Sequence, residues 1–340
     1  MSDRGARQAE ERKATTLNDF FYDEYLEAAR ATKKPRTVGT EVALYEKWIK
    51  PTLGVRPVRR LVPMDFKRLQ MKIIDGDLKK DPKTGKSVRV PKSPRTVHYA
   101  VSIVIQVWNA AFDAKGIVDE RPPSRSSLGL VMVDNERTRA MTPEQASAFL
   151  GKMQKRSPQW HDISSLSLFA GLRASECYRL QIEHFDAQRK RIFLLTPKKQ
   201  KSTYLTINDT AFRLLERLKS EHPTGKGLFF TNRKGHEITE VSDTVKRVID
   251  SLGFNEGVTD DRDKITFHSL RHSHATWLLN SNVDIFTVNK LLRHSTLDMT
   301  KRYLHPGEER LRAAAENLDG SLPFSDVQND VPAKGQKGKG

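Results

Sequence analysis

A polar, proline-interrupted stretch at residues 119–137 divides the 340-residue chain into two parts, each long enough to bury a hydrophobic core. Its run Arg121-Pro122-Pro123-Ser124 is typical of a linker. Residues 1–13 are charged and lack apolar periodicity, and the residues from 319 onward are polar and rich in glycine and lysine. We therefore expect a flexible arm at 1–13, a first domain at 14–118, a linker at 119–137, a second domain at 138–318 and a disordered tail at 319–340.

Apolar residues recur at helical spacing through most of both parts. In the first part this spacing predicts helices at 17–31, 36–49, 63–74 and 94–116, with a basic loop between the last two. In the second part, Thr142-Pro143-Glu144-Gln145 combines an N-cap with a first-turn proline and predicts a helix start. There follow a short helix at 163–170, strands at 191–195 and 203–207, and helices at 208–220, 239–252, 268–280, 284–292, 296–304 and 308–317. The expected fold class is mainly α with a small β-sheet.

The chain is strongly basic, with a formal net charge of +17, and its cations cluster. Residues 77–95 hold seven basic and two acidic side chains around a turn signal at 81–85. Some basic proteins are merely soluble and cationic, but clustering favours a nucleic-acid surface whose affinity weakens with salt. We assign DNA contacts to the basic residues of this stretch and to two lysines of the later hairpin: Lys79, Lys80, Lys83, Lys86, Arg89, Lys92, Arg95, Lys199 and Lys201.

Several classes of protein are disfavoured. No apolar run approaches the roughly 18 residues of a membrane span, and the first residues lack the apolar core of a signal peptide. We therefore expect a cytoplasmic, nucleoid-associated protein without a membrane partner. The single cysteine, Cys177, excludes an internal disulfide, and we expect it to be a buried packing residue.

Two partial motifs do not support a bound cofactor or metal. Gly85-Lys86-Ser87 resembles the end of a phosphate-binding loop, but the required leading glycine is replaced by Lys80. His268, His272 and His274 suggest zinc, yet the His-Glu-x-x-His pattern is missing. We expect neither a cofactor nor a metal.

Four short segments in the second half of the chain carry residues suited to one reaction. They are Gly171-Leu172-Arg173-Ala174-Ser175-Glu176, His268-Ser269-Leu270-Arg271-His272, Leu291-Leu292-Arg293-His294 and Thr300-Lys301-Arg302-Tyr303. Guanidinium groups match the oxygens of a phosphate, and imidazoles donate hydrogen bonds or move protons. A phenol with a pKa of about 10 becomes a nucleophile once it is positioned and deprotonated. These residue types predict transfer of a phosphodiester onto a tyrosine oxygen.

The order of these segments resembles the tyrosine recombinases, the lambda-integrase-like phage integrase family of site-specific DNA recombinases, over residues 14–318. The resemblance assigns the nucleophile to Tyr303 and the other catalytic positions to Arg173, Lys198, His268, Arg271 and His294. Lys198 is placed by its position in the predicted hairpin, where Lys199 and Lys201 are its neighbours. Glu176 and His272 are assigned supporting roles.

The chain departs from the family pattern at two places. The family usually has Leu-Gly-His where this chain has Leu292-Arg293-His294, and Val-Pro-Leu where it has Leu205-Thr206-Ile207. We expect Arg293 to adjust a turn or to add a phosphate contact. Neither departure removes a reacting group.

The resemblance implies a helical core-binding (SAM-like) domain at 14–118 and a tyrosine-recombinase catalytic domain at 138–318. It also implies the chemistry: the two arginines clamp the scissile phosphate, His268 accepts the tyrosine proton, His294 donates a hydrogen bond, and Lys198 protonates the departing 5′ oxygen. The implied partners are double-stranded DNA at specific recombination sites, a homo-tetramer on that DNA, and accessory DNA-bending or directionality factors. Two alternatives remain, a type IB topoisomerase with the same chemistry and a non-catalytic DNA-binding regulator of the same fold.

Overall fold

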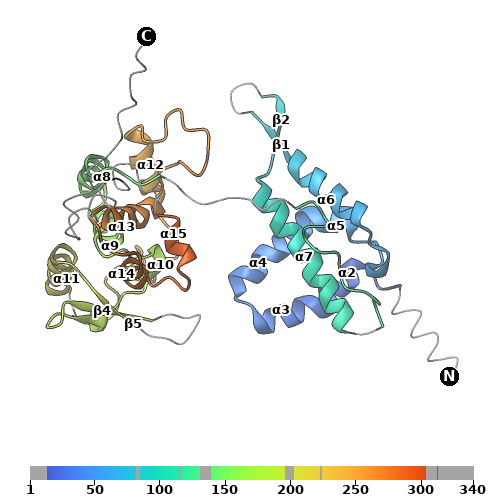
Figure 1. Cartoon of the computed structure of the whole chain (residues 1–340), viewed down its shortest axis with the longest axis horizontal. Helices are drawn as coiled ribbons and strands as arrows, with labels where there is room; N and C mark the ends of the chain where they lie inside the picture. Colours follow the sequence, from blue (N-terminus) through green and yellow to red (C-terminus); the bar gives the residue numbers. More distant parts are fainter. Residues whose placement is uncertain are drawn as a thin grey trace, which may run out of the picture. The chain divides into compact units, whose positions relative to one another are not determined.

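The computed structural model describes residues 14–81, 85–114, 116–130, 139–195, 203–222, 224–303 and 312. The chain separates into two compact units, Met1–Asp134 and Asn135–Gly340, and each has its own hydrophobic core (Figure 1). The described residues are mainly helical with two small sheets, which confirms the predicted fold class. None of the described helices is both long and apolar enough to cross a bilayer.

The first unit is a group of helices around one apolar core. Its helical elements are α2 (Leu17–Phe20), η1 (Phe21–Tyr25), α3 (Leu26–Thr32), α4 (Pro35–Leu44), η2 (Tyr45–Ile49), α5 (Lys50–Leu53), η3 (Val58–Arg60), α6 (Pro63–Asp75) and α7 (Pro94–Asp113). Phe21 stacks on Tyr45 with ring centroids 3.5 Å apart, which joins the first two helical stretches through their buried faces. All four predicted helices are present, although the second continues through α5.

The basic stretch between α6 and α7 is a β-hairpin, so the prediction of a loop was wrong. Strand β1 (Asp77–Lys80) pairs antiparallel with β2 (Ser87–Val90), and the hairpin projects from the helices of its own unit (Figure 1). The alternating valines Val88 and Val90 favour an extended backbone, but a four-residue strand is too short to give a clear period-two signal. Gly76 makes the turn into β1 at φ +78°, where an added Cβ would meet the Val90 carbonyl oxygen at 1.9 Å.

Part of the predicted linker packs onto the first unit. Leu128 is only 1% exposed within that unit's core. Gln70 Nε2 donates a hydrogen bond to the Leu128 carbonyl at 3.1 Å, and Trp108 Nε1 donates one to the Glu120 carbonyl at 2.9 Å. Residues 116–130 therefore belong to the first unit, and residues 131–137 lie outside the described part of the chain.

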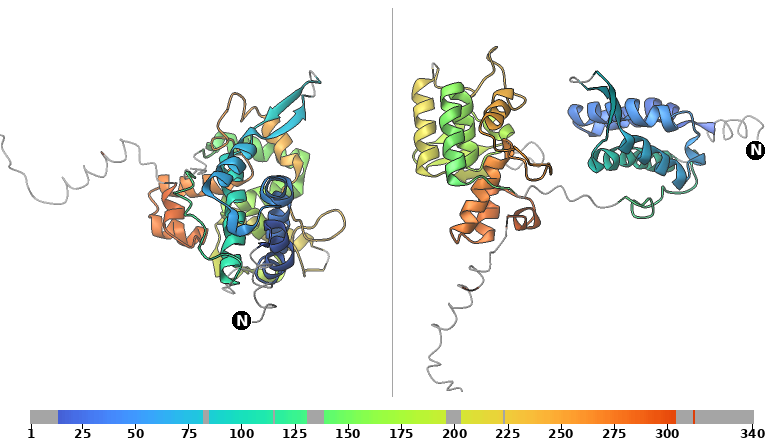
Figure 2. Two further views of the ribbon diagram at one scale, coloured as in Figure 1. Left: turned by 90° about the vertical axis from the view of Figure 1, so that its right-hand side faces the viewer. Right: turned by 90° about the horizontal axis from the view of Figure 1, so that it is seen from above.

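The second unit joins helices to a three-stranded antiparallel sheet in the order β3-β4-β5. Its elements are α8 (Pro143–Arg156), α9 (Pro158–Phe169), α10 (Ala174–Tyr178), η4 (Ile182–His184), β3 (Phe185–Asp186), β4 (Arg191–Leu194), β5 (Thr203–Thr206), α11 (Asp209–Glu221), α12 (Asp243–Ser251), α13 (His268–Asn280), α14 (Ile285–Leu292) and α15 (Asp298–Lys301). Helix α9 packs between α8 and α11 (Figure 2). The Thr142 hydroxyl accepts a hydrogen bond from the Gln145 backbone N–H, which confirms the predicted helix start.

Some of the other predictions for the second unit are confirmed and one is wrong. The two predicted strands and the helix at 268–280 are confirmed. The helix predicted at 296–304 is wrong in length, because α15 is only one turn long and ends before a turn that carries Tyr303. The helix predicted at 308–317 lies, apart from residue 312, outside the described residues.

Candidate active site

Arg271 lies at the centre of the site, on the buried face of α13. Its side chain is 1% exposed and donates hydrogen bonds from Nη1 to the Gly171 carbonyl and from Nη2 to the Leu292 carbonyl. These bonds tie the segment after α9 and the end of α14 to α13. Burial, with help from the charge of Arg173, lowers the pKa of Arg271 to about 9, while Glu176 opposes that change. The group therefore stays cationic at neutral pH.

Gly171 allows this close approach of the backbone. It has φ +60°, and an added Cβ would lie 2.7 Å from His274 Cδ2. His274 Nδ1 donates a hydrogen bond to the Leu168 carbonyl at 2.8 Å, and burial lowers the pKa of His274 to about 4. His274 is therefore a neutral packing residue beneath the site. Among the described residues, no group of three His, Cys, Asp or Glu side chains is placed to hold a metal ion.

Three arginines surround one carboxylate, that of Glu176. The Arg173 backbone N–H donates to Oε2 at 2.8 Å, and Arg173 Nη1 donates to Oε1 at 2.9 Å. Arg293 Nη2 donates to Oε2 at 2.7 Å, and Arg271 Nη1 lies 3.7 Å from the same oxygen. Burial would raise the pKa of Glu176, but the charges of Arg293 and Arg271 and the Arg173 N–H outweigh it and lower the pKa. Three cations and one anion leave a net positive charge, which suits an anionic ligand.

His294 follows Arg293, and its ring contacts the Thr300 side chain of α15, which the Asn289 side chain of α14 holds in turn. Its Nδ1 lies 2.8 Å from Thr300 Oγ1, which accepts a hydrogen bond from Asn289 Nδ2 at 3.0 Å. Burial, with the charges of Arg271 and Arg173, lowers the pKa of His294 to about 3, so its imidazole is neutral. Thr300 Oγ1 accepts from Asn289 and carries one proton, which it can donate to Nδ1. This arrangement favours the tautomer in which Nε2 carries the hydrogen and can donate.

Tyr303 lies at the turn after α15, with two imidazole rings close to its own ring. Its side chain is 5% exposed and packs in a small apolar cluster with Ala275, Leu279, Val288 and Leu292. The His272 ring centroid is 4.8 Å from that of Tyr303, and the His294 ring is 6.0 Å away with its plane tilted by 17°. The phenol is also close enough to Arg271 to act on that residue's pKa.

The structure thus brings together six of the predicted site residues: Arg173, Glu176, Arg271, His272, His294 and Tyr303. His268 is the first residue of α13 and has an exposed side chain. Lys198, Lys199 and Lys201 lie outside the described residues, as does Lys83.

The described candidates for DNA contact lie on or beside the β1-β2 hairpin. Lys79, Lys80, Lys86 and Arg89 are exposed on the hairpin, and Arg95 is exposed in the first turn of α7. Lys92 and Arg89 already have acidic partners. Lys92 Nζ is 2.8 Å from Asp77, and Arg89 pairs with Asp75.

Sequence reasoning missed three residues of the site. Arg293 was expected to adjust a turn or to add a phosphate contact; it does lie in a left-handed turn, but its partnership with Glu176 was not foreseen. The roles of Asn289 and Thr300 in holding His294 had no signal, because a lone amide or hydroxyl within a helix has many possible roles. Cys177 is buried as predicted, and burial raises the pKa of its thiol.

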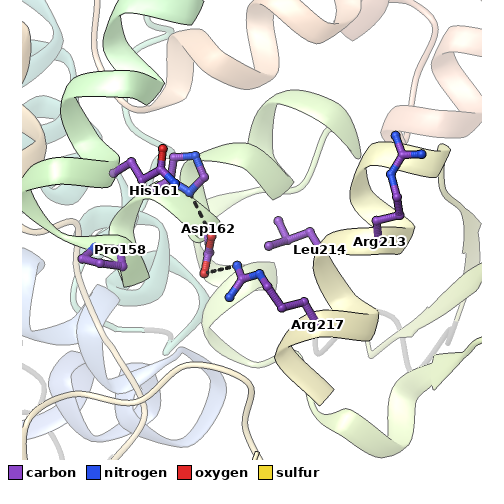
Figure 3. A pocket seen from close by; sticks show the side chains of 7 residues that line it. Pro158, His161, Asp162, Arg213, Leu214 and Arg217 are labelled. Carbon is purple, nitrogen blue, oxygen red and sulfur yellow. Dashed lines mark hydrogen bonds and ion pairs between the residues drawn. The ribbon is translucent and has the colours of Figure 1, made fainter. Parts of the chain in front are cut away.

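A pocket of about 570 Å³ lies apart from this site (Figure 3). It lies where the start of α9 faces α11, whereas the arginine cluster follows the end of α9. Within it, Asp162 accepts a hydrogen bond from Arg217 at 2.8 Å and lies 2.9 Å from His161 Nδ1. None of the predicted site residues lines it.

Comparison with known proteins places this geometry in a family. The model of the phage integrase family matches residues 139–310, which cover the whole arginine cluster and Tyr303. The integrase of Salmonella phage P22 is 26% identical over 218 residues, covering 60% of this chain and 53% of that protein. The tyrosine recombinase XerC of Roseiflexus castenholzii is 29% identical over 210 residues, covering 57% of this chain and 63% of that protein. The chain thus spans between about half and two thirds of the length of these relatives.

A solved structure shares the fold over most of the chain. The Tn1549 transposon integrase in complex with transposon right end DNA has a TM-score of 0.68 and 18% identity, covering 90% of this chain and all (100%) of that one. The family model spans half of the chain and includes each of the four motif segments. The chain therefore belongs to the phage integrase family, the tyrosine recombinases.

Proposed function

We propose that this protein is a site-specific DNA recombinase that cleaves and rejoins DNA through a 3′-phosphotyrosyl bond to Tyr303. The observation that carries the proposal is the proximity of the Tyr303 ring to His272 and His294, beside a cluster of three arginines and one carboxylate. A phenol, imidazoles and excess guanidinium charge in one place suit phosphoryl transfer better than any other chemistry of these groups.

The arginines would hold the scissile phosphate. Arg173 is 35% exposed at the N-cap of α10, so its guanidinium can reach an incoming phosphate while Nη1 keeps its bond to Glu176. Two backbone carbonyls accept hydrogen bonds from Arg271 and hold its guanidinium in place. The guanidinium therefore need not move when charge develops on the phosphate. Such preorganised donors stabilise a transition state more than a ground state.

We assign the imidazoles two different roles, hydrogen-bond donation to the phosphate and acceptance of the tyrosine proton. His294 is neutral, and its Nε2–H would donate to a non-bridging oxygen without changing its protonation state. We assign acceptance of the Tyr303 proton to His268, as the family resemblance implies, with His272 supporting the Tyr303 ring at a centroid distance of 4.8 Å. Lys198 would protonate the leaving 5′ oxygen. Since the covalent link keeps the bond energy, rejoining needs no cofactor.

Duplex DNA would be contacted by both units. The net charge of +17 and the exposed lysines of the β1-β2 hairpin support electrostatic binding, and the related Tn1549 integrase was solved with transposon DNA. By family membership we propose a homo-tetramer that exchanges strands between two specific sites during integration or excision of a mobile element in the cytoplasm. Accessory bending or directionality factors belong to the same proposal.

The test is covalent trapping on a nicked duplex substrate that loses a short 5′-hydroxyl fragment after cleavage. The wild-type protein should form a detergent-resistant adduct, and Tyr303→Phe should bind the same DNA but form none. Tyr204→Phe, which alters an exposed tyrosine of β5, is the matched control and should form adducts normally. Adducts that persist in Tyr303→Phe would show that the nucleophile is elsewhere.

A further inference from the structure

Arg293 adopts a backbone conformation that residues other than glycine rarely take. It caps the C-terminus of α14 with φ +54° and ψ +43°, in the left-handed region. Glycine is the default residue there because a Cβ crowds the backbone. A glycine would make this turn without strain, so the turn alone gives no reason for an arginine.

The side chain of Arg293 is committed to the inside of the protein. It is 10% exposed, and Nη2 donates to Glu176 Oε2 at 2.7 Å while Nη1 donates to the Leu291 carbonyl at 2.7 Å. Its Nε is buried and makes no hydrogen bond to any described residue. Burial lowers the pKa of Arg293, and Glu176 opposes that change. The arginine is therefore buried at a cost that chiefly one carboxylate offsets.

The carboxylate of Glu176 is shared with both arginines that would bind the phosphate. Arg173 donates to it from its backbone and its guanidinium, and Arg271 lies 3.7 Å from it. Arg293 thus reaches the phosphate-binding arginines through one intermediate group. It also directly precedes His294, and the His294 backbone N–H donates to the Asn289 carbonyl at 3.2 Å in the same turn.

We propose that Arg293 is a positioning residue whose guanidinium, through Glu176, holds Arg173 and Arg271 ready for the phosphate and fixes the turn that presents His294. This inference rests on the proposed function and assigns a role that the motif residues alone do not. The phosphate contacts implied by the family resemblance come from Arg173 and Arg271, whereas the family usually has glycine at position 293; the two terminal nitrogens of Arg293 donate to the Leu291 carbonyl and to Glu176.

Arg293→Gly separates the turn from the side chain, because glycine keeps the left-handed backbone and removes the guanidinium. In single-turnover cleavage of the nicked substrate, we expect this variant to cleave roughly 10- to 100-fold more slowly, the range for a broken contact pair in a charged network. Its DNA affinity should stay within about twofold of wild type, since Arg293 is assigned no phosphate contact and the contacts that it supports are few among many. Arg293→Lys, which keeps the charge, should recover part of the rate.

A double-mutant cycle tests whether Arg293 acts through Glu176. Combined with Glu176→Gln, Arg293→Gly should slow cleavage little beyond the effect of Glu176→Gln alone, because the shared contact is already broken. Effects that multiply in the double variant would overturn the inference, and so would wild-type cleavage by Arg293→Gly. If Arg293→Gly failed to fold, cleavage by Arg293→Lys and by Glu176→Gln would be measured instead. A wild-type cleavage rate in either of these variants would overturn the inference. A wild-type protein that forms no adduct would overturn the proposed function and this role with it, whereas a competent Arg293→Gly overturns this role alone.

Discussion

The β1-β2 hairpin and the arginine cluster both gather positive charge, but they hold it in opposite ways. On the hairpin, Lys79, Lys80 and Lys86 are exposed to solvent. In the cluster, Arg271 and Arg293 are buried and bonded to backbone carbonyls and to Glu176. An exposed cation interacts weakly and is screened by salt, whereas a buried one is fixed and strongly coupled to its neighbours.

Because of this difference, we expect the hairpin to affect DNA affinity and the arginine cluster to affect the cleavage rate. Charges on the hairpin should contribute to DNA binding in small and nearly additive steps. Charges in the cluster should control the cleavage rate in large steps that depend on one another.

The largest effect is expected from the two arginines proposed to bind the phosphate. Arg173→Ala and Arg271→Ala should each slow single-turnover cleavage by about 10²- to 10³-fold, the cost of removing one preorganised donor. Only Arg271→Ala should also lower the free energy of unfolding, because Arg271 is buried and bonded to the Gly171 and Leu292 carbonyls while Arg173 is half exposed. Cleavage kinetics and urea denaturation measure the two effects.

Arg173→Ala therefore serves as the control for stability in this pair. Cleavage by Arg173→Ala at the wild-type rate would contradict its place in the site. An equal decrease in the free energy of unfolding in both variants would contradict the expected difference between the partly exposed Arg173 and the buried Arg271.

The next effect is on the pH dependence of stability, and it should be confined to the second unit. A histidine in an unfolded chain has a pKa of about 6.5. The folded values for His274 and His294 are lowered to about 4 and about 3. Below about pH 6.5 the unfolded chain binds protons that the folded protein does not, so the free energy of unfolding falls as the pH drops toward about 4.

Amide hydrogen exchange at pH 7.5 and 5.5, corrected for intrinsic rates, should show lost protection in the second unit. The first unit has a single histidine, His98, and is the internal control. His294→Gln should flatten the dependence by removing one titrating group. Equal losses of protection in both units would contradict the assignment to these two histidines.

The smallest effect is expected on the hairpin. Lys79→Ala with Lys80→Ala should weaken DNA binding by a few-fold and reduce the slope of log affinity against log salt by about 2, since each phosphate contact contributes about 0.9. Cleavage at saturating protein should be unchanged. Lys152→Ala with Lys155→Ala, which removes two exposed lysines from α8, is the matched control. An unchanged salt slope in the hairpin variant would show that the hairpin does not touch DNA.

The two regions also differ in how far the sequence predicts them. The helices of the first unit and the Thr142 helix start follow from apolar spacing and capping residues, which are local signals. The hairpin strands were missed because four residues give too little periodicity. Likewise, the burial of Leu128 in a proline-rich stretch depends on a surface that other segments create.

In the site, the residue types predicted phosphoryl transfer, and the resemblance to the tyrosine recombinases assigned roles to Arg173, Arg271, His294 and Tyr303. What the sequence could not supply is how they are held. The bond between Arg293 and Glu176 joins residues 117 positions apart. The Asn289, Thr300 and His294 contacts depend on how α14 meets α15. Such contacts arise only once the fold brings distant segments together.

The most direct test of the account is to identify the residue that carries the DNA. After trapping on the nicked substrate and digestion with a protease, mass spectrometry should find the nucleotide-bearing peptide to contain Tyr303, linked through the 3′ phosphate. A link to any other tyrosine, or through a 5′ phosphate, would contradict the proposal that Tyr303 attacks the phosphate held by Arg173 and Arg271.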